Sequence, residues 1–290
     1  MMTVCLIVLL TGCGVDRNIK KGEKFLSLGE YYDAANQFKT AYQRTPPKDR
    51  KQRGEMANKM AQAYERISSS QRAAAAYRNV IRYKQDNGDT HRQLAACLMK
   101  EGDYAEAVKE YQIALDSMPD NQTLVAELEA AKTASAAKER GSKYIVSRMD
   151  VFNSRRQDYS PMLYGDQFNQ LYFTSTRNEA QGDAISGITG VKAGDIFVSE
   201  KDDKGKWGTP QDIVSGLNTK DDEGTPAFSV DGREMYITQC KTDPNYPRYA
   251  QIAVSNRADA SWGAAKKLEI SRDSLSNFAH PALSPDGNWL

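Results

Sequence analysis

The sequence predicts a multi-domain protein, in which an all-α solenoid of repeated helix pairs is followed by an all-β, incomplete β-propeller. Two observations carry this prediction. Between Asp16 and about Arg140, aromatic and small residues recur at intervals close to 34 residues, which is typical of stacked helix pairs. From residue 142 onward, a proline-containing pattern recurs at longer intervals with alternating apolar runs, which is typical of propeller blades. One repeat of either kind cannot bury its apolar face alone, so copies must stack.

The helical half contains three copies of one unit. Phe38, Tyr77 and Tyr111 occupy the same place in the three copies, 39 and 34 residues apart. We assign the five extra residues of the first interval to a loop that carries Pro46 and the charged run 48–53. This spacing resembles the tetratricopeptide repeat, whose 34-residue unit is two antiparallel helices, so the resemblance implies a tetratricopeptide-repeat solenoid.

Small residues mark the places where the predicted helices cross closely, and aromatic residues fill the gaps between them. The small residues are Gly22, Ala61 and Ala95 on the first helices and Ala34, Ala73 and Ala107 on the second helices. A further helix can begin at Asp120 or Asn121, with Leu124 and Leu128 facing inward and Gly141 as its end. This last helix would cap the solenoid.

The concave face of such a solenoid is lined by residues of the first helices, and it is a candidate groove for a peptide or protein partner. The candidate residues are Asn58, Gln62, Arg66, Arg92, Met99 and Lys100. For each of them the alternative, a merely solvated side chain, stays open.

The second half repeats a pattern around Pro161, Pro226 and Pro281, which are 65 and 55 residues apart. In a full unit, an inner strand at the proline leads through a Gly/Asp turn into a returning strand, as at 171–174 and 235–238. The other predicted strands are a third at 195–199, fourth strands at 207–214 and 262–270, and an outermost strand at 144–152. This makes two blades and the start of a third.

Two blades and a fragment cannot close a ring of four to eight, so we expect a truncated propeller and a longer natural protein. The predicted domains are a lipoprotein signal peptide over 1–12, the helical domain with its capping helix over 13–141, and the partial β-propeller over 142–290.

The N-terminus predicts a lipid anchor. The apolar run Val4–Leu10 is too short to span a bilayer and ends in Leu-Thr-Gly-Cys at residues 10–13. This tetrapeptide resembles a bacterial lipobox, and the resemblance implies that Cys13 is lipidated and becomes the mature N-terminus. A chance cysteine in an apolar N-terminus is the alternative. No Lys or Arg precedes the run, which leaves the true start of the signal peptide open.

Composition and motifs argue against several function classes. The chain carries 39 basic and 38 acidic residues, which gives no argument for binding nucleic acid. The two histidines, His91 and His280, have no partner at metal-ligand spacing, and no G-x-S-x-G motif occurs. The acidic run 221–223 could hold calcium but is more typical of a solvated turn. We therefore expect no catalytic residues, no metal site and no cofactor, and hence no enzyme.

Motifs such as T-P-A-F-S-V-D-G at 225–232 and S-P-D-G at 284–287 look like TolB-type, WD-repeat-like blades. The order of lipobox, tetratricopeptide repeats and blades resembles the OmpA-family lipoproteins of Bacteroidetes, which include a component of the type IX secretion system. The resemblance implies a scaffold on the periplasmic face of the outer membrane. Its partners would be envelope or secretion-system proteins, the membrane through the lipid anchor, and peptidoglycan through a C-terminal OmpA-like domain absent here. The alternatives are a ligand-binding or sensor lipoprotein and the gate of a propeller-associated peptidase.

Overall fold

The computed structural model describes residues 3–213, 216–241, 249–259, 261–273 and 276–290, with side chains from Gly14 onward. The chain divides into two compact units. The first is Met1–Ile145 with Ser186–Gly190, and the second is Val146–Ile185 with Val191–Leu290. The first unit is helical and the second is built of antiparallel sheets, as the sequence predicts.

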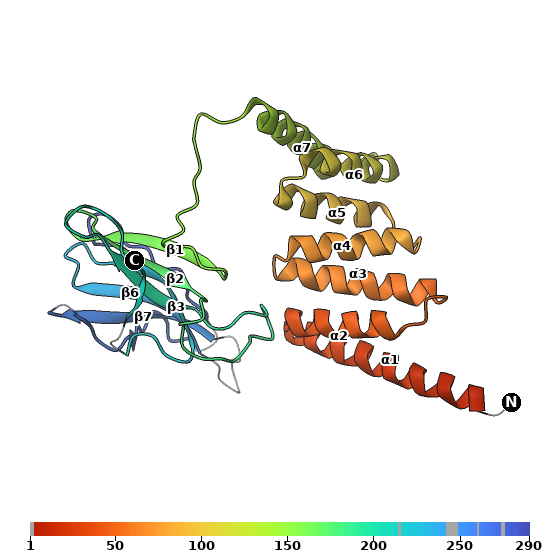
Figure 1. The fold of residues 1–290 in the computed structure, drawn as a ribbon, viewed down its shortest axis with the longest axis horizontal. Coiled ribbons are helices and arrows are strands. Elements are labelled where there is room, and N and C mark those ends of the chain that lie inside the picture. The colour runs from red at the N-terminus through yellow and green to blue at the C-terminus, as the bar shows by residue number, and fades with distance from the viewer. Residues whose placement is uncertain (1–2, 214–215, 242–248, 260, 274–275) are drawn as a thin grey trace. The chain divides into compact units, whose positions relative to one another are not determined.

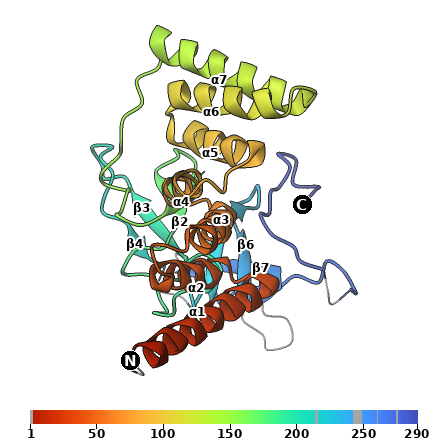
Figure 2. The ribbon, with the colours of Figure 1, turned by 90° about the vertical axis from the view of Figure 1, so that its right-hand side faces the viewer.

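Consecutive helices of the first unit pack as antiparallel pairs, and each pair lies on the next (Figures 1 and 2). Odd-numbered helices are the first helices of the repeats, and even-numbered helices are the second. The described helices are α1 (Thr3–Leu28), α2 (Tyr31–Arg44), α3 (Arg50–Arg66), α4 (Ser70–Arg82), α5 (Gly88–Glu101), α6 (Tyr104–Ser117) and α7 (Gln122–Arg140).

The predicted crossing points form the helical core. Ala34, Ala73 and Ala107 are completely buried, and so is Phe38. A Cβ atom added to Gly22 would lie 2.6 Å from Cε1 of the Phe38 ring, so this helix pair approaches too closely for a side chain at position 22. The repeat of small residues therefore sets the distance between helices.

The ends of the helices follow their capping residues. Asn121 accepts a hydrogen bond from the Leu124 backbone N–H at 3.1 Å, and Gly141 ends α7, which confirms the predicted capping helix. The predicted charged loop is partly wrong, because α3 already begins at Arg50. Asp49 accepts a hydrogen bond from the Gln52 N–H and so starts the helix inside the charged run.

Two sheets of blade-like topology form the second unit. The first is ordered β1-β2-β3-β4 and the second β5-β6-β7-β8, with β9 pairing with β7, and every pairing is antiparallel. The described strands are β1 (Asp158–Tyr164), β2 (Gln170–Ser175), β3 (Asp195–Glu200), β4 (Gln211–Asp212), β5 (Asp222–Phe228), β6 (Glu234–Lys241), β7 (Tyr249–Ala258), β8 (Ser261–Trp262) and β9 (Lys266–Lys267). Successive strands of each meander pair with each other, as in part of a β-propeller.

The structure differs from the strand predictions in three regions, and in one of them the predicted strands are present but shorter. Residues 144–152 form no strand, and Tyr144, Ile145 and Val146 are more than four-fifths exposed, because no described strand lies beside them to complete a ladder. The predicted fourth strands shrink to the two-residue strands β4, β8 and β9. The third repeat, residues 278–290, contains no described strand.

The third repeat nevertheless keeps one backbone feature of the first two. Ser160, Thr225 and His280, each just before the repeated proline, have positive φ angles of 52°, 52° and 59°. The N–H of Thr225 donates to Oγ1 of Thr174 at 2.9 Å, and the N–H of His280 donates to Oγ1 of Thr238 at 2.8 Å. The hydroxyl of a threonine in one repeat thus binds the backbone N–H of the positive-φ residue in the next repeat. This repeated hydrogen bond joins neighbouring blades.

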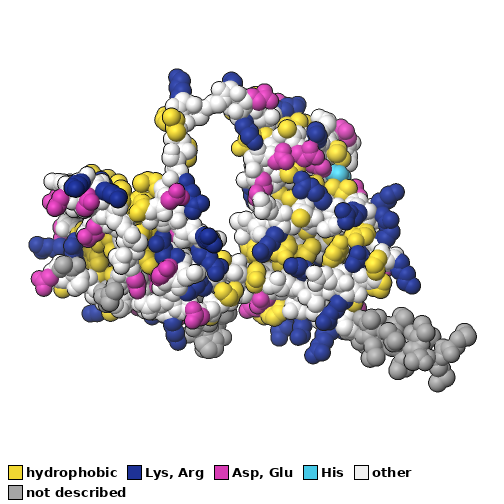
Figure 3. Space-filling view, in the orientation of Figure 1, with side chains coloured by type: hydrophobic (Ala, Val, Ile, Leu, Met, Phe, Trp, Pro, Cys, Tyr) yellow, Lys and Arg dark blue, Asp and Glu magenta, His cyan; other side chains and the backbone are white. Residues whose placement is uncertain are grey.

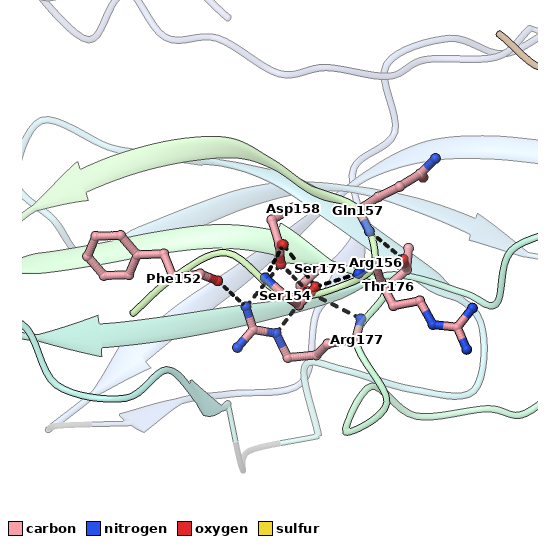
Figure 4. Close-up of polar contacts among 8 residues, drawn as sticks. All are labelled: Phe152, Ser154, Arg156, Gln157, Asp158, Ser175, Thr176 and Arg177. Atoms are coloured by element: carbon pink, nitrogen blue, oxygen red, sulfur yellow. Dashed lines mark hydrogen bonds and ion pairs between the residues drawn. The ribbon is translucent and has the colours of Figure 1, made fainter. Parts of the chain in front are cut away.

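In the two blade-like sheets, a carboxylate of the inner strand holds the segment that enters the sheet, and Figure 4 shows this for Asp158 in the first sheet. Asp158 accepts hydrogen bonds from the Ser154 N–H and Oγ, from Oγ of Ser175 and from the Arg177 guanidinium, at 2.6–3.0 Å. Burial raises the pKa of Asp158, but these donors outweigh burial and lower it. Glu223 takes the same place 65 residues later. The predicted solvated turn at 221–223 is therefore wrong for Glu223, which is completely buried and bound by Thr219 and Gln239.

Candidate protein-binding groove

A groove of about 670 Å³ lies over the first helices of the solenoid. We call it the first-helix groove. It is lined by Leu26 of α1, Tyr31 at the start of α2, Gln62, Glu65 and Arg66 of α3, and Gln93 of α5. Two of the six predicted groove residues, Gln62 and Arg66, therefore line one cavity.

The side chains of this groove offer donors and acceptors that a polypeptide can use. Gln62 and Arg66 are exposed, and the Arg66 guanidinium carbon lies 5.9 Å from the centroid of the Tyr31 ring. Amide side chains can pair with a peptide backbone, and the guanidinium can pair with a carboxylate. The spacing of Gln62 and Arg66, four residues apart on one helix, places them on the same face.

The floor of the groove is fixed by a buried polar contact. Glu65 accepts hydrogen bonds from the Tyr77 hydroxyl and from the Cys97 thiol, whose Sγ lies 4.0 Å away. Burial raises the pKa of Tyr77, and the bond to Glu65 raises it further. Burial, with the charge of Glu65, raises the pKa of Cys97 to about 11, so this thiol stays protonated at neutral pH. These contacts hold the Glu65 side chain in place at the groove.

The other predicted groove residues lie elsewhere on the first helices. Arg92 is bound by Glu127 of α7 through hydrogen bonds of 2.8 and 2.6 Å, so its charge is already paired. Met99 packs against the helical core, Asn58 is half-buried and Lys100 is exposed. Sequence spacing placed these residues on the first helices, but it could not show that α7 supplies a partner for Arg92.

A cluster of aromatic side chains lies in the second unit, where Trp262 joins the two sheets. Its Nε1 donates to the Tyr172 hydroxyl at 3.2 Å, and its ring lies 5.6 Å from the Phe228 ring. Beside this cluster, a hollow of about 470 Å³ is lined by residues from 162–168, 227–232 and 281–285. Its lining residues belong to the three repeats around Pro161, Pro226 and Pro281.

The remaining predictions concern the absence of a metal site and the attachment to a membrane. No group of three or more His, Cys, Asp or Glu among the described residues is placed to hold a metal ion. Within the described chain, no helix combines the length and the apolar character needed to cross a bilayer. The backbone of Cys13 lies in α1, but its side chain falls outside the described side chains. Cys97 and Cys240 are free.

Comparison with known proteins identifies the helical repeat. The family described as tetratricopeptide repeat matches residues 58–121. The chain carries tetratricopeptide repeats. This match spans part of α3 and all of α4, α5 and α6, so the helical unit is suited to binding other proteins.

Solved structures resemble the tetratricopeptide-repeat unit at low sequence identity. The first tetratricopeptide-repeat domain of Spaghetti (RPAP3), bound to an HSP90 peptide, is 19% identical, with 43% of this chain and 94% of that chain covered and a TM-score of 0.37. The tetratricopeptide-repeat domain of Sgt2 from Aspergillus fumigatus is 17% identical, with 47% of this chain and 88% of that chain covered and a TM-score of 0.37. A C-terminal domain of a Plasmodium falciparum FK506-binding protein is 14% identical, with 45% of this chain and 94% of that chain covered and a TM-score of 0.40. No curated protein matches the chain.

Proposed function

We propose that this chain belongs to a non-enzymatic scaffold lipoprotein of the bacterial outer membrane. The observation that carries the proposal is the first-helix groove, an open polar surface on a tetratricopeptide-repeat unit. Surfaces of this kind hold extended partner segments through many modest contacts. The tetratricopeptide-repeat unit would bind a subunit of an envelope machine, and the sheets of the second unit would offer another protein-binding face.

The finer assignment rests on the order of motifs in the sequence. A lipid at Cys13 would hold the protein on the periplasmic face of the outer membrane. The resemblance to OmpA-family lipoproteins supports a PorE-like member of the type IX secretion system, with peptidoglycan bound by a domain outside this chain. A triacylated cysteine would make the anchor effectively permanent, whereas a single acyl chain binds reversibly.

Co-purification from detergent-solubilised envelopes of the native host tests this proposal. Arg66→Glu reverses a charge inside the first-helix groove, and Lys109→Glu makes the same change on α6, where Lys109 is exposed. We expect secretion-system or other outer-membrane proteins to co-purify with the wild type and with Lys109→Glu, and to be depleted at least fivefold with Arg66→Glu. Equal recovery with both variants would contradict a role for the groove. A Cys13→Ser variant should leave the membrane fraction.

The hollow of the second unit supports a second candidate, a sensor that binds a small ligand. Its lining combines the aromatic rings of Tyr164 and Phe228 with the exposed apolar side chains of Leu163 and Val230. Such a mixture suits a small, partly apolar molecule. Thermal stabilisation of the chain by a metabolite pool, lost on Phe228→Ala, would favour the sensor over the scaffold.

A further inference from the structure

The near-neutral charge of the chain hides a strong separation of charge along the helical unit. Residues 31–85 contain twelve Lys and Arg against four Asp and Glu. Residues 86–141 contain six Lys and Arg against eleven Asp and Glu. On the face shown in Figure 3, Lys and Arg side chains are spread over α1 to α4, while a cluster of acidic side chains lies near α6. The segment α2 to α4 is therefore a basic surface, although the whole chain is balanced.

A second groove, of about 360 Å³, opens on this basic surface. We call it the second-helix groove, because its sides are α2 and α4 and its floor is Met60 and Tyr64 of α3. It is separate from the first-helix groove and shares no lining residue with it. Its polar and aromatic lining includes Asn36, Lys39, Tyr42, Tyr64, Arg72 and Asn79.

The positive charges of the second-helix groove are available to a ligand. Lys39 and Arg72 are exposed on opposite sides of it, and none of its lining residues is an Asp or Glu. Among the described residues, no carboxylate forms an ion pair with either, in contrast to Arg92 and its partner Glu127. The guanidinium carbon of Arg72 lies 5.8 Å from the centroid of the Tyr64 ring, which orients it without neutralising it.

A third cation is held rigidly beside the groove. Arg53 donates to the carbonyl oxygen of Thr45 at 3.0 Å and to the hydroxyl of Tyr83 at 2.9 Å. Its guanidinium carbon lies 4.8 Å from the centroid of the Tyr42 ring, and Tyr42 lines the groove. Burial raises the pKa of Tyr42, so its hydroxyl remains a neutral hydrogen-bonding group near this charge. This fixed cation adds positive potential beside the two exposed cations, Lys39 and Arg72.

The geometry points to an acidic segment of a partner protein as the ligand of the second-helix groove, and we propose that it binds there. Asp and Glu side chains of the segment would pair with Lys39 and Arg72. Its backbone amides would pair with the side-chain amides of Asn36 and Asn79, which can both donate and accept. A recessed groove with tyrosines and amides suits an extended peptide, whereas a lipid surface or a duplex would favour a flat array of cations. This binding is independent of the first-helix groove.

Fluorescence anisotropy with the whole chain tests the proposal. The probe is a fluorescein-labelled peptide of eight residues, six of them Asp or Glu, and its control replaces every acid by the matching amide. Lys39→Glu with Arg72→Glu reverses the charges of the groove. Lys20→Glu with Lys24→Glu makes the same change in net charge on exposed positions of α1. Because all four side chains are exposed, the fold should survive, and far-UV circular dichroism checks this.

We expect the acidic peptide to bind the wild type and the Lys20/Lys24 variant within twofold of each other at 150 mM salt. The Lys39/Arg72 variant should bind it at least tenfold more weakly, which corresponds to about 1.4 kcal/mol, and the amide peptide should bind weakly to all three proteins. Equal losses in both variants would overturn the proposal, because only bulk charge would matter. Tighter binding of the same groove to single-stranded DNA or to phosphatidylglycerol vesicles would also overturn it. So would a concentration-dependent dimer lost in the Lys39/Arg72 variant, which would make a second copy the occupant.

Discussion

The buried carboxyl group of Asp195 makes the stability of the second unit depend on pH. Asp195 opens β3 and is completely buried. Its Oδ2 accepts a hydrogen bond from the Gln181 N–H at 2.6 Å, while Oδ1 has no partner among the described residues. Burial raises the pKa of this carboxyl from 3.8 to about 7, and the negative charges of Glu223 and Asp212 act in the same direction. Replacing Asp195 by Asn keeps the shape of the side chain and removes its ionisation.

The sign and size of the effect follow from the two pKa values. Between about pH 4 and pH 7, the folded state holds a proton on Asp195 that the unfolded state has released, so stability falls as the pH rises. The slope is about 1.4 kcal/mol per pH unit, and the full cost above pH 7 is about 4 kcal/mol. The Asp195→Asn variant does not carry this cost. Its free energy of unfolding, relative to wild type, should therefore grow by roughly 3 kcal/mol between pH 5 and pH 8.

Urea unfolding followed by tryptophan fluorescence measures this difference. All three tryptophans, at positions 207, 262 and 289, lie in the second unit, so the signal reports that unit alone. Asp183→Asn is the matched control, because the Asp183 side chain is fully exposed. A difference in free energy of unfolding between Asp195→Asn and wild type that stays the same from pH 5 to pH 8 would refute the reasoning. A constant difference would reflect only a change in hydrogen bonding. A pH-dependent advantage of Asp183→Asn would refute it as well.

Two further predictions concern the packing of each unit. Gly22→Ala should lower the free energy of unfolding of the helical unit by about 1 to 3 kcal/mol, because the new methyl group meets the buried ring of Phe38. The control is Gly14→Ala in the same helix, where the new methyl group makes only an ordinary contact, so this variant should be neutral or stabilising by up to about 1 kcal/mol. Circular dichroism at 222 nm during heating gives the melting temperature of each variant. Equal melting temperatures for the two variants would contradict the close approach of the helices at Gly22. Thr174→Val should destabilise the second unit by about 1 to 3 kcal/mol, because the N–H of Thr225 loses its acceptor. Urea unfolding by tryptophan fluorescence checks this value, and an unchanged midpoint would show that the contact does not join the blades.

The helical unit could be predicted almost completely from sequence because its signals are local and repeated. The small residues at Ala34, Ala73 and Ala107 and the capping residue Asn121 act on neighbours within one or two helices. Such contacts repeat with the sequence, so a period in the sequence becomes a period in space. The same period placed Gln62 and Arg66, which line the first-helix groove, on α3.

Features that depend on residues far away in the sequence, or on whether a partner strand is present, could not be predicted. The alternation at 144–146 is a sound strand pattern, but a strand also needs an edge to pair with. Arg92 lies on the predicted face, yet Glu127, 35 residues away, neutralises it. The burial of Glu223 depends on Gln239 of the next strand, which the acidic run itself does not reveal. The second-helix groove does not follow from the balanced charge of the whole chain, because that balance averages a basic stretch with an acidic one.

Site-specific photo-crosslinking in the native envelope tests most directly whether the first-helix groove holds a partner protein. A benzophenone amino acid at Gln62 lies in that groove, and the same amino acid at Gln112 lies on the exposed surface of α6. The scaffold account predicts a discrete protein adduct at position 62 whose partner is an envelope protein, with none at position 112. Absence of an adduct at position 62, or the same adduct at both positions, would contradict it.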